Sequence, residues 1–306
     1  MSSEGGTKAI IAALAANIGI AITKFVAFLV SGSSSMLAES IHSVADSGNQ
    51  VLLLIGGHRA KQVANEEHPF GYGRLRYLYS FLVAVVLFVV GGLFSVYEGV
   101  HKLQHPEAIE NPAVPLVVLL IAIGLESFSL RTAVHEARPH LRGDTWWQFI
   151  RRAKSPELPV VLLEDTAALV GLVLALIGVG MAVITDNGRW DGLGSVAIGV
   201  LLLVVAVILG TETQSMLVGE GARPSMVADI HAALEDDDAV RRVIHLRTLH
   251  ISPDEVLVAA KIAVDHDVTA ADIARTIDAA ERRVRAIAPI ATLIYLEPDV
   301  DRGEGA

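Results

Sequence analysis

Six long apolar stretches are the feature of this sequence that most constrains its fold. A helix needs roughly 20 mostly apolar residues to cross the hydrocarbon core of a bilayer. The stretches are about Ala9–Val30, Met36–Gly57, Tyr77–Tyr97, Ala113–Val134, Leu158–Ile184 and Leu193–Gly210. An apolar fraction of 52% and a mean hydropathy of +0.51 agree with them. We therefore expect a polytopic α-helical membrane protein with six transmembrane helices in a lipid bilayer.

Lysine and arginine are unevenly distributed between the loops, which predicts the orientation of the chain in the membrane. One side carries Lys8, Arg59, Lys61, Arg74, Arg76, Arg131, Arg138, Arg142, Arg151, Arg152 and Lys154. The other side carries Lys102 and Arg189. We therefore expect the basic side, with both termini, to lie in the cytoplasm. The first stretch is too long for a cleaved signal peptide, and there is no transit-peptide composition. These features favour a bacterial plasma (inner) membrane.

Composition excludes several other classes of protein. The formal charge of -10 argues against a nucleic-acid partner, because nucleic-acid-binding surfaces are basic. The chain has no cysteine, so it has no disulfide framework, no thiolate zinc site and no thiol nucleophile.

The composition changes after the sixth stretch, so we place a domain boundary between residues 214 and 215. Residues 215–306 are acidic, and their pattern predicts helix, strand, strand, helix and strand in that order. The clearest strand alternates apolar residues from Val256 to Val264, and a helical stripe follows from Ile273 to Ile287. We therefore expect a transmembrane domain at 1–214 and a small α/β domain at 215–306.

The second stretch carries the densest group of polar residues within the predicted membrane helices. Glu39, His42, Asp46, Asn49 and Gln50 fall on one helical face, with His42 and Asp46 one turn apart. Ionisable groups inside a membrane are rare and usually face a polar pathway. The alternative is a buried His–Asp hydrogen bond that only ties helices together.

The fifth stretch adds Glu164 and Asp165 in an apolar setting. Imidazole nitrogens and carboxylate oxygens bind divalent transition metals, and zinc accepts such mixed sets. These ligands must lose protons to bind metal, so metal loading releases protons. The set therefore predicts an exchange site for metal and protons.

Two further ionisable groups lie within predicted membrane helices. Lys24 either extends toward the interface or neutralises a carboxylate. Glu126 has three open roles, namely helix packing, proton handling and metal ligation. Both are candidates for proton transfer or for support of the site, and Asn49 is a third.

Several motifs resemble the cation diffusion facilitator family. They are Ser40–Asp46 with Asn49 and Gln50, His68–Arg74 in the following loop, and Trp190–Ser195 before the sixth stretch. Val161–Ala168 is similar to the branch of the family that includes zinc transporter 9 and its bacterial relatives. The resemblance covers nearly the whole chain.

This resemblance implies a homodimeric, proton-coupled exporter of divalent metal with a cytoplasmic ferredoxin-like domain. It assigns metal ligands to His42 and Asp46 in the second helix and to Asp165 in the fifth. The remaining ligand position falls on Val161, which cannot bind metal. Glu164 is the candidate substitute, although it lies about 100° from its neighbour around the helix. Water, or Asn49, is the other candidate for this position.

The loop and the tail depart further from the family pattern. Where many members have an acidic residue and two histidines, this loop has Asn65, His68 and Tyr72, so His68 with Glu67 is the secondary metal site that remains. Strand positions that hold histidines in some members are Ile244, Ala260 and Tyr295 here. We therefore expect a tail that dimerises without a well-formed binuclear metal site.

The leading hypothesis is a cation/proton antiporter whose substrate is zinc, with manganese, iron, cobalt and cadmium as alternatives, and without a fixed cofactor. One competing hypothesis is an intramembrane metal hydrolase. It is disfavoured because His135-Glu136 is followed by Ala-Arg-Pro, which does not complete an HExxH helix, so we do not expect an enzyme. The other is a metal-responsive membrane sensor or non-transporting scaffold, which the missing ligand at Val161 supports.

Overall fold

The computed structural model describes residues 3–141 and 143–300, and for residues 3–16 it describes the backbone alone. The chain divides into two compact units. One contains Met1–Arg59 and Leu75–Gln214, and the other contains Ala60–Arg74 and Ser215–Ala306. The loop at 60–74 therefore folds with the C-terminal unit, although it connects two helices of the first.

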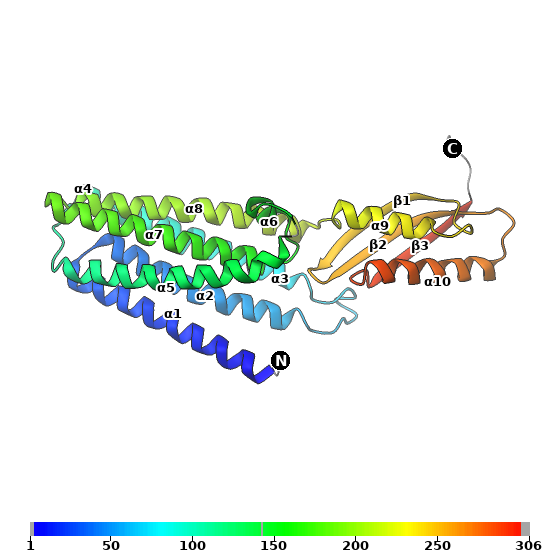
Figure 1. Ribbon diagram of the computed structural model, residues 1–306, viewed down its shortest axis with the longest axis horizontal. Coiled ribbons are helices and arrows are strands. Elements are labelled where there is room, and N and C mark those ends of the chain that lie inside the picture. Colours follow the sequence, from blue (N-terminus) through cyan, green and yellow to red (C-terminus); the bar gives the residue numbers. More distant parts are fainter. Residues whose placement is uncertain (1–2, 142, 301–306) are drawn as a thin grey trace. The chain divides into compact units, whose positions relative to one another are not determined.

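The first unit is built from long helices that run side by side (Figure 1). The helical elements of this unit, long and short, are α1 (Ser3–Ser31), α2 (Ser34–Arg59), α3 (Leu75–Val86), η1 (Leu87–Leu93), α4 (Phe94–Gln104), α5 (Ala113–Ala137), η2 (Arg138–His140), α6 (Trp146–Arg152), α7 (Glu157–Thr185) and α8 (Arg189–Val218). Helices α3 and α4 are joined without a break through η1, a π-helical segment. Together they form one helix from Leu75 to Gln104.

Four helices in the described part of the chain are long and apolar enough to cross a membrane. They cover Leu75–Gln104, Ala113–His140, Glu157–Thr185 and Arg189–Val218. The described side chains of α1 add a shorter apolar segment, Asn17–Ser31. Helix α2 has 26 residues, but its serines and ionisable groups lower its mean hydropathy. Six spans therefore remain a prediction.

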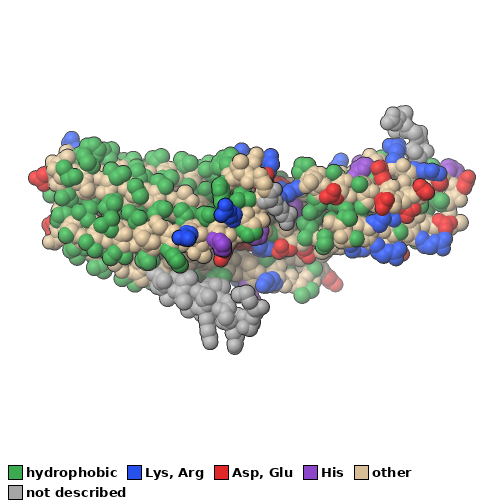
Figure 2. All heavy atoms as spheres, in the orientation of Figure 1, with side chains coloured by type: hydrophobic (Ala, Val, Ile, Leu, Met, Phe, Trp, Pro, Cys, Tyr) green, Lys and Arg blue, Asp and Glu red, His purple; other side chains and the backbone are tan. Residues whose placement is uncertain are grey.

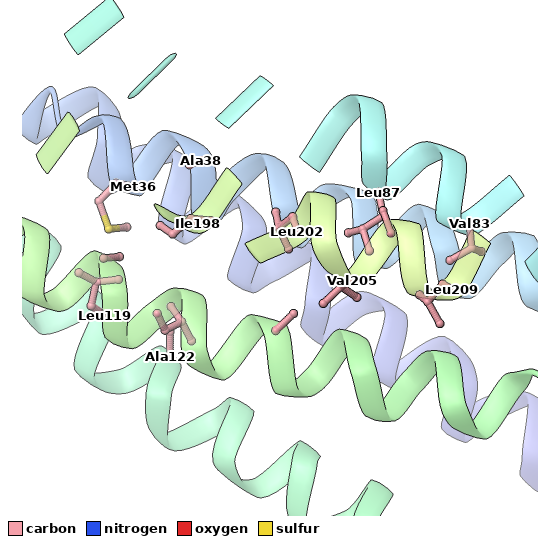
Figure 3. Packing of buried hydrophobic residues seen from close by; sticks show 14 of the residues in the cluster. Met36, Ala38, Val83, Leu87, Leu119, Ala122, Ile198, Leu202, Val205 and Leu209 are labelled. Atoms are coloured by element: carbon pink, nitrogen blue, oxygen red, sulfur yellow. The ribbon is translucent and has the colours of Figure 1, made fainter. Parts of the chain in front are cut away.

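Apolar side chains from several helices meet in one core (Figure 3). Met36 and Ala38 come from α2, Leu119 comes from α5, and Leu202 comes from α8. Many other apolar side chains point outward, among them Phe128, which is 74% exposed, and Figure 2 shows hydrophobic side chains over much of this unit. Because lipid is as apolar as these side chains, close packing has to hold the helices together.

Glycines allow close contact between α4 and α8. A Cβ on Gly99 would lie 2.6 Å from the backbone nitrogen of Val196, and a Cβ on Gly199 would lie 2.6 Å from that of Val96. The two backbones could not approach this closely with larger residues. This is the small-residue packing that membrane helices use.

Up to residue 300, the C-terminal unit is a three-stranded sheet with two helices. Its elements are α9 (Pro224–Glu235), β1 (Arg242–Ser252), β2 (Glu255–Val264), α10 (Ala270–Ile287) and β3 (Leu293–Val300). The strand order is β1-β2-β3, with β1 antiparallel to β2 and β3 parallel to β2. This is the element order expected from the sequence. The parallel pair is joined through α10, as a crossover requires.

Both helices of this unit cover one face of the sheet. Val256 and Val258 of β2 share a buried core with Ile230 of α9 and Val284 of α10. Alternate residues of β2 are buried because successive side chains point to opposite faces. Charged residues gather on the surface of this unit (Figure 2).

Candidate metal site

Helix α2 places the candidate donors His42 and Asp46 one turn apart. The His42 side chain is 1% exposed, and its Nδ1 lies 3.5 Å from Asp46 Oδ1. Both ring nitrogens of His42 and Oδ1 of Asp46 are buried without a hydrogen-bond partner among the described residues. Buried polar atoms are nearly always satisfied. One nitrogen of the neutral imidazole and the Asp46 oxygen therefore each have a free lone pair for a cation.

Glu164 of α7 reaches across to α2. Asn49 Nδ2 donates a hydrogen bond to Glu164 Oε1 at 2.7 Å, and both side chains are buried. The Asn49 Oδ1 atom has no partner among the described residues. Asn49 therefore holds Glu164 near the polar face of α2, and its role in supporting a metal site remains a prediction.

Asp165 points in another direction, toward α5. Ser129 Oγ donates a hydrogen bond to Asp165 Oδ2 at 2.9 Å. The divergence follows from helix geometry, because adjacent residues lie about 100° apart around the axis. Glu164 and Asp165 therefore connect α7 to two different helices.

These groups meet at a cavity of about 80 Å³. Its lining residues are Asn17, Ile20, Ser43, Asp46, Gln50, Leu125, Glu126, Ser129, Val161, Glu164 and Asp165. These described residues include four carboxylates and no lysine or arginine. His42 is not part of this lining, although it contacts Asp46.

The predicted metal ligands lie near one another, but they do not form a complete coordination shell for a metal ion. Asp46, Glu164 and Asp165 share the cavity, and Val161 lines it with an apolar side chain. Among the described residues, no three His, Asp or Glu side chains are close enough together to hold a metal ion. A bound cation would therefore need the side chains around the cavity to move toward it.

Lys24 is part of a buried network instead of reaching toward the interface. Its Nζ donates hydrogen bonds to Glu39 Oε2 at 3.0 Å and to Ser43 Oγ at 2.8 Å. The Lys24 and Glu39 side chains are 1% and 0% exposed. Of the two roles considered for Lys24, the structure places it as the partner of a carboxylate, and that carboxylate is Glu39.

The loop at 60–74 is organised by hydrogen bonds and stacking. The backbone N–H of His68 donates to Asn65 Oδ1 at 2.7 Å, and Asn65 Nδ2 donates to Tyr72 Oη at 3.0 Å. The ring of His68 lies on that of Tyr72, with centroids 4.4 Å apart. Glu67 is exposed. The predicted pairing of His68 with Glu67 as a metal site remains a prediction.

The tail residues at the family's ligand positions lie on the sheet. Ile244 is half-buried on β1, Ala260 is buried on β2, and Tyr295 is exposed on β3.

Lys261 forms ion pairs with Glu297 at 3.2 Å and with Asp299 at 3.0 Å. Hydrogen bonds to Asp299 and Glu297 raise the pKa of Lys261.

Asp191 links the beginnings of two helices, a role that its sequence position did not indicate. Its buried carboxylate accepts hydrogen bonds from Ser33 Oγ at 2.8 Å, Ser34 N at 2.7 Å and Ser35 N at 3.1 Å. It thus satisfies free N–H groups at the beginning of α2 from the beginning of α8. The available signal was an aspartate in the Trp190–Ser195 motif together with a run of serines before α2.

The first unit thus has apolar helices around an acidic cavity, with buried nitrogen and oxygen atoms that have no hydrogen-bond partner among the described residues. This combination defines a membrane protein that handles cations.

The chain belongs to the cation efflux family, so the family resemblance seen in the motifs is confirmed. The family's transmembrane domain, described as "Cation efflux transmembrane domain", matches residues 10–218. "Cation efflux protein, cytoplasmic domain" matches residues 222–299. The protein is therefore a member of a transporter family, with a membrane domain and a C-terminal cytoplasmic domain.

Relatives of this chain include proteins named as a zinc antiporter, a manganese efflux system protein and a metal tolerance protein. The chain is 33% identical to the human mitochondrial proton-coupled zinc antiporter SLC30A9 over 265 residues, covering 86% of this chain and 46% of that protein. It is 28% identical to metal tolerance protein C4 of Arabidopsis thaliana, covering 86% of this chain and 58% of that protein. It is 24% identical to the manganese efflux system protein MneP of Bacillus subtilis, covering 88% and 89%. The chain thus spans about half the length of the SLC30A9 relatives.

Proposed function

We propose that this chain is a proton-coupled antiporter that exports divalent metal, with zinc as its cargo, from the cytoplasm. The observation that carries this proposal is the cavity lined by Asp46, Glu126, Glu164 and Asp165, with no lysine or arginine among its described lining residues. Carboxylates in apolar surroundings require cations or protons as partners. Because metal binds only the deprotonated groups, metal and protons compete for the same cavity.

His42 favours zinc over harder cations. An imidazole nitrogen suits zinc, whereas carboxylate and carbonyl oxygens suit manganese and magnesium. His42 and Asp46 would supply a nitrogen and an oxygen from α2, and Asp165 and Glu164 would supply oxygens from α7. Glu126, together with Asn49, would support the site or carry protons. The names of the SLC30A9 relatives support zinc, and the name of the Bacillus relative keeps manganese as the main competitor.

The proposed architecture has six transmembrane helices, cytoplasmic termini and a ferredoxin-like C-terminal domain that forms a homodimer. It rests on the apolar stretches, on the excess of basic residues in alternate loops and on the match to the cytoplasmic domain. We propose a bacterial plasma membrane as its location. The SLC30A9 relatives are named as mitochondrial proteins, so fractionation of the source cells would test this part.

Zinc uptake into proteoliposomes under an imposed pH gradient tests the transport proposal. The wild-type protein should take up zinc and move protons in the opposite direction. Asp46→Asn should abolish both fluxes, because it removes a charged donor from the cavity. Glu164→Gln should reduce them if Glu164 supplies the ligand missing at Val161.

Asp186→Asn is the matched control, because Asp186 is an exposed residue at the end of α7. This variant should transport like the wild type. Normal flux in Asp46→Asn would contradict the assigned site. Zinc flux without proton movement would contradict the antiport mechanism.

A metal-responsive sensor or scaffold is the second candidate, and one observation favours it. The described residues contain no group of three donors close enough to hold a metal ion, and Val161 occupies a ligand position. A sensor would bind zinc and change conformation without flux. Zinc binding that is lost in Asp46→Asn, with no flux of zinc or manganese in the wild type, would establish this alternative.

A further inference from the structure

A buried ion pair lies beside the proposed metal site. Lys24 of α1 and Glu39 of α2 are almost completely buried, with 3.0 Å between Nζ and Oε2. Burying two charges costs free energy that their attraction often fails to recover, so apolar replacements are frequently as stable. A contribution to the stability of the fold is therefore a weak explanation for why this ion pair is present.

The pair is linked to the cavity through Ser43. Lys24 Nζ donates to Ser43 Oγ at 2.8 Å, and Ser43 lines the cavity next to Asp46. The ammonium group is thus held by a carboxylate oxygen and a hydroxyl oxygen on α2. A metal ion could use the same carboxylate, so the ammonium group occupies the place of a cation.

Glu39 has the position and the free atom of a potential metal ligand. It precedes His42 by three residues and Asp46 by seven, so all three lie on one face of α2. Its Oε1 atom is buried without a hydrogen-bond partner among the described residues. This oxygen faces Gly171 of α7, where an added Cβ would lie 2.7 Å from it. The missing side chain at Gly171 leaves room for the carboxylate.

We propose that Lys24 is a specificity-determining residue that keeps Glu39 out of the coordination shell of the metal. Its ammonium group, fixed to α1, occupies the position beside Glu39 that a metal ion would otherwise take. Each chain then holds one metal ion at His42 and Asp46 instead of two along the face. This inference rests on the proposed function, because it requires metal to bind at this site.

Three variants separate the charge of Lys24 from ligation by Glu39. Lys24→Gln should add one zinc ion per chain, because the Glu39 carboxylate and the Ser43 hydroxyl that Lys24 occupies become free donors. Glu39→Gln should weaken zinc binding by about tenfold or more, because an unpaired positive charge then lies near the metal. Lys24→Gln with Glu39→Gln should return to the wild-type number of ions and to within about threefold of the wild-type affinity, because that charge is gone.

The experiment is calorimetric titration of the purified full chain in nanodiscs with zinc, with size-exclusion profiles to check folding. An unchanged number of ions in Lys24→Gln would overturn the proposal. So would a double variant as weak as Glu39→Gln, since Glu39 would then be a ligand in the wild type. If Lys24→Gln does not fold, the comparison of Glu39→Gln with the double variant still decides.

Lys102→Gln is the matched control. Lys102 is also buried, but it binds the backbone oxygen of Gly32 at 3.0 Å and does not line the cavity. Its removal should leave zinc binding unchanged. Lys24→Arg keeps the charge and should retain the wild-type number of ions.

The titration also separates this inference from the proposed function. A wild-type protein whose zinc binding is unaffected by Asp46→Asn would contradict the site itself. Zinc binding that depends on Asp46, but not on Lys24 and Glu39 in the expected pattern, would contradict only this inference.

Discussion

Neighbouring residues of this chain have different roles because the helix points them in different directions. Glu164 accepts a hydrogen bond from Asn49 of α2, whereas Asp165 accepts one from Ser129 of α5. Val161 lies one turn before Asp165 and lines the same cavity. At the residue scale, the cavity therefore has an apolar side chain at the position where relatives of this family are expected to have a metal ligand.

Replacing Val161 with a metal-binding residue should strengthen zinc binding. Val161→His places an imidazole one turn from Asp165, and we expect zinc affinity to increase by about tenfold, which is about 1.4 kcal/mol. The measurement is zinc titration of the purified protein. Val170→His is the control, because Val170 is exposed on the same helix and lies outside the cavity. Equal affinities in the two variants would show that position 161 does not face the metal.

At the scale of elements, α2 is held at its first turn by α8. Asp191 accepts hydrogen bonds from two backbone N–H groups of α2, those of Ser34 and Ser35, and its charge favours the positive end of the helix dipole. The polar residues 39, 42 and 46 follow within the next turns. The position of the candidate donors therefore depends on a contact between helices that are distant in sequence.

Asp191→Asn should destabilise the first unit by about 2 kcal/mol, because an amide N–H₂ replaces an acceptor in a buried site. Thermal unfolding of the detergent-solubilised protein measures this change. The exposed substitution Asp186→Asn should leave the melting temperature within error. A melting temperature of Asp191→Asn equal to the wild type would contradict the capping role.

The helix α10 begins with a capping box, in which Thr269 and Asp272 bond to each other's backbone N–H. Hydrogen bonds from Thr269 and Arg275 lower the pKa of the Asp272 carboxyl. Its contribution to stability is therefore present above its ordinary pKa and is lost as the pH falls through the lowered value. Thr269→Ala should reduce hydrogen-exchange protection of the first turn of α10 by about fivefold at neutral pH.

Hydrogen exchange of the full chain, read by mass spectrometry, provides this measurement. Thr276→Ala, on the same helix but away from its beginning, is the control. Unchanged hydrogen exchange of the first turn in Thr269→Ala would show that the cap does not stabilise the beginning of α10.

At the scale of the whole molecule, the loop at 60–74 connects the two units. It joins α2 to α3 but packs within the C-terminal unit. Gly73 is in close contact with that unit, because an added Cβ would lie 2.4 Å from Ser252 Cβ. The loop is continuous in the chain with α2, the helix that carries His42 and Asp46.

Gly73→Val should separate the loop from the tail, since neither backbone has room for the side chain. We expect faster hydrogen exchange in residues 60–74 and lower zinc flux in proteoliposomes. Gly57→Val is the control, because a Cβ on Gly57 meets no atom within 4 Å. Faster exchange with unchanged flux would show that loop packing does not influence transport.

The amino-acid sequence by itself predicted the long helices, the element order of the C-terminal unit and the polar face of α2. Apolar stretches predicted the long helices, because spanning a bilayer requires length and composition that are visible locally. The spacing of Glu39, His42 and Asp46 predicted their shared face, and the alternation from Val256 to Val264 predicted β2, because both periods follow from backbone geometry.

Only the tertiary structure decided how these elements meet. Sequence spacing could not show that Lys24 pairs with Glu39, that Asp191 caps α2, or that the loop at 60–74 folds with the tail. These contacts join residues far apart in the chain, and they depend on which helices are neighbours and how each is rotated about its axis. That rotation is set by the packing of the whole unit, and it also directs Glu164 to α2 and Asp165 to α5.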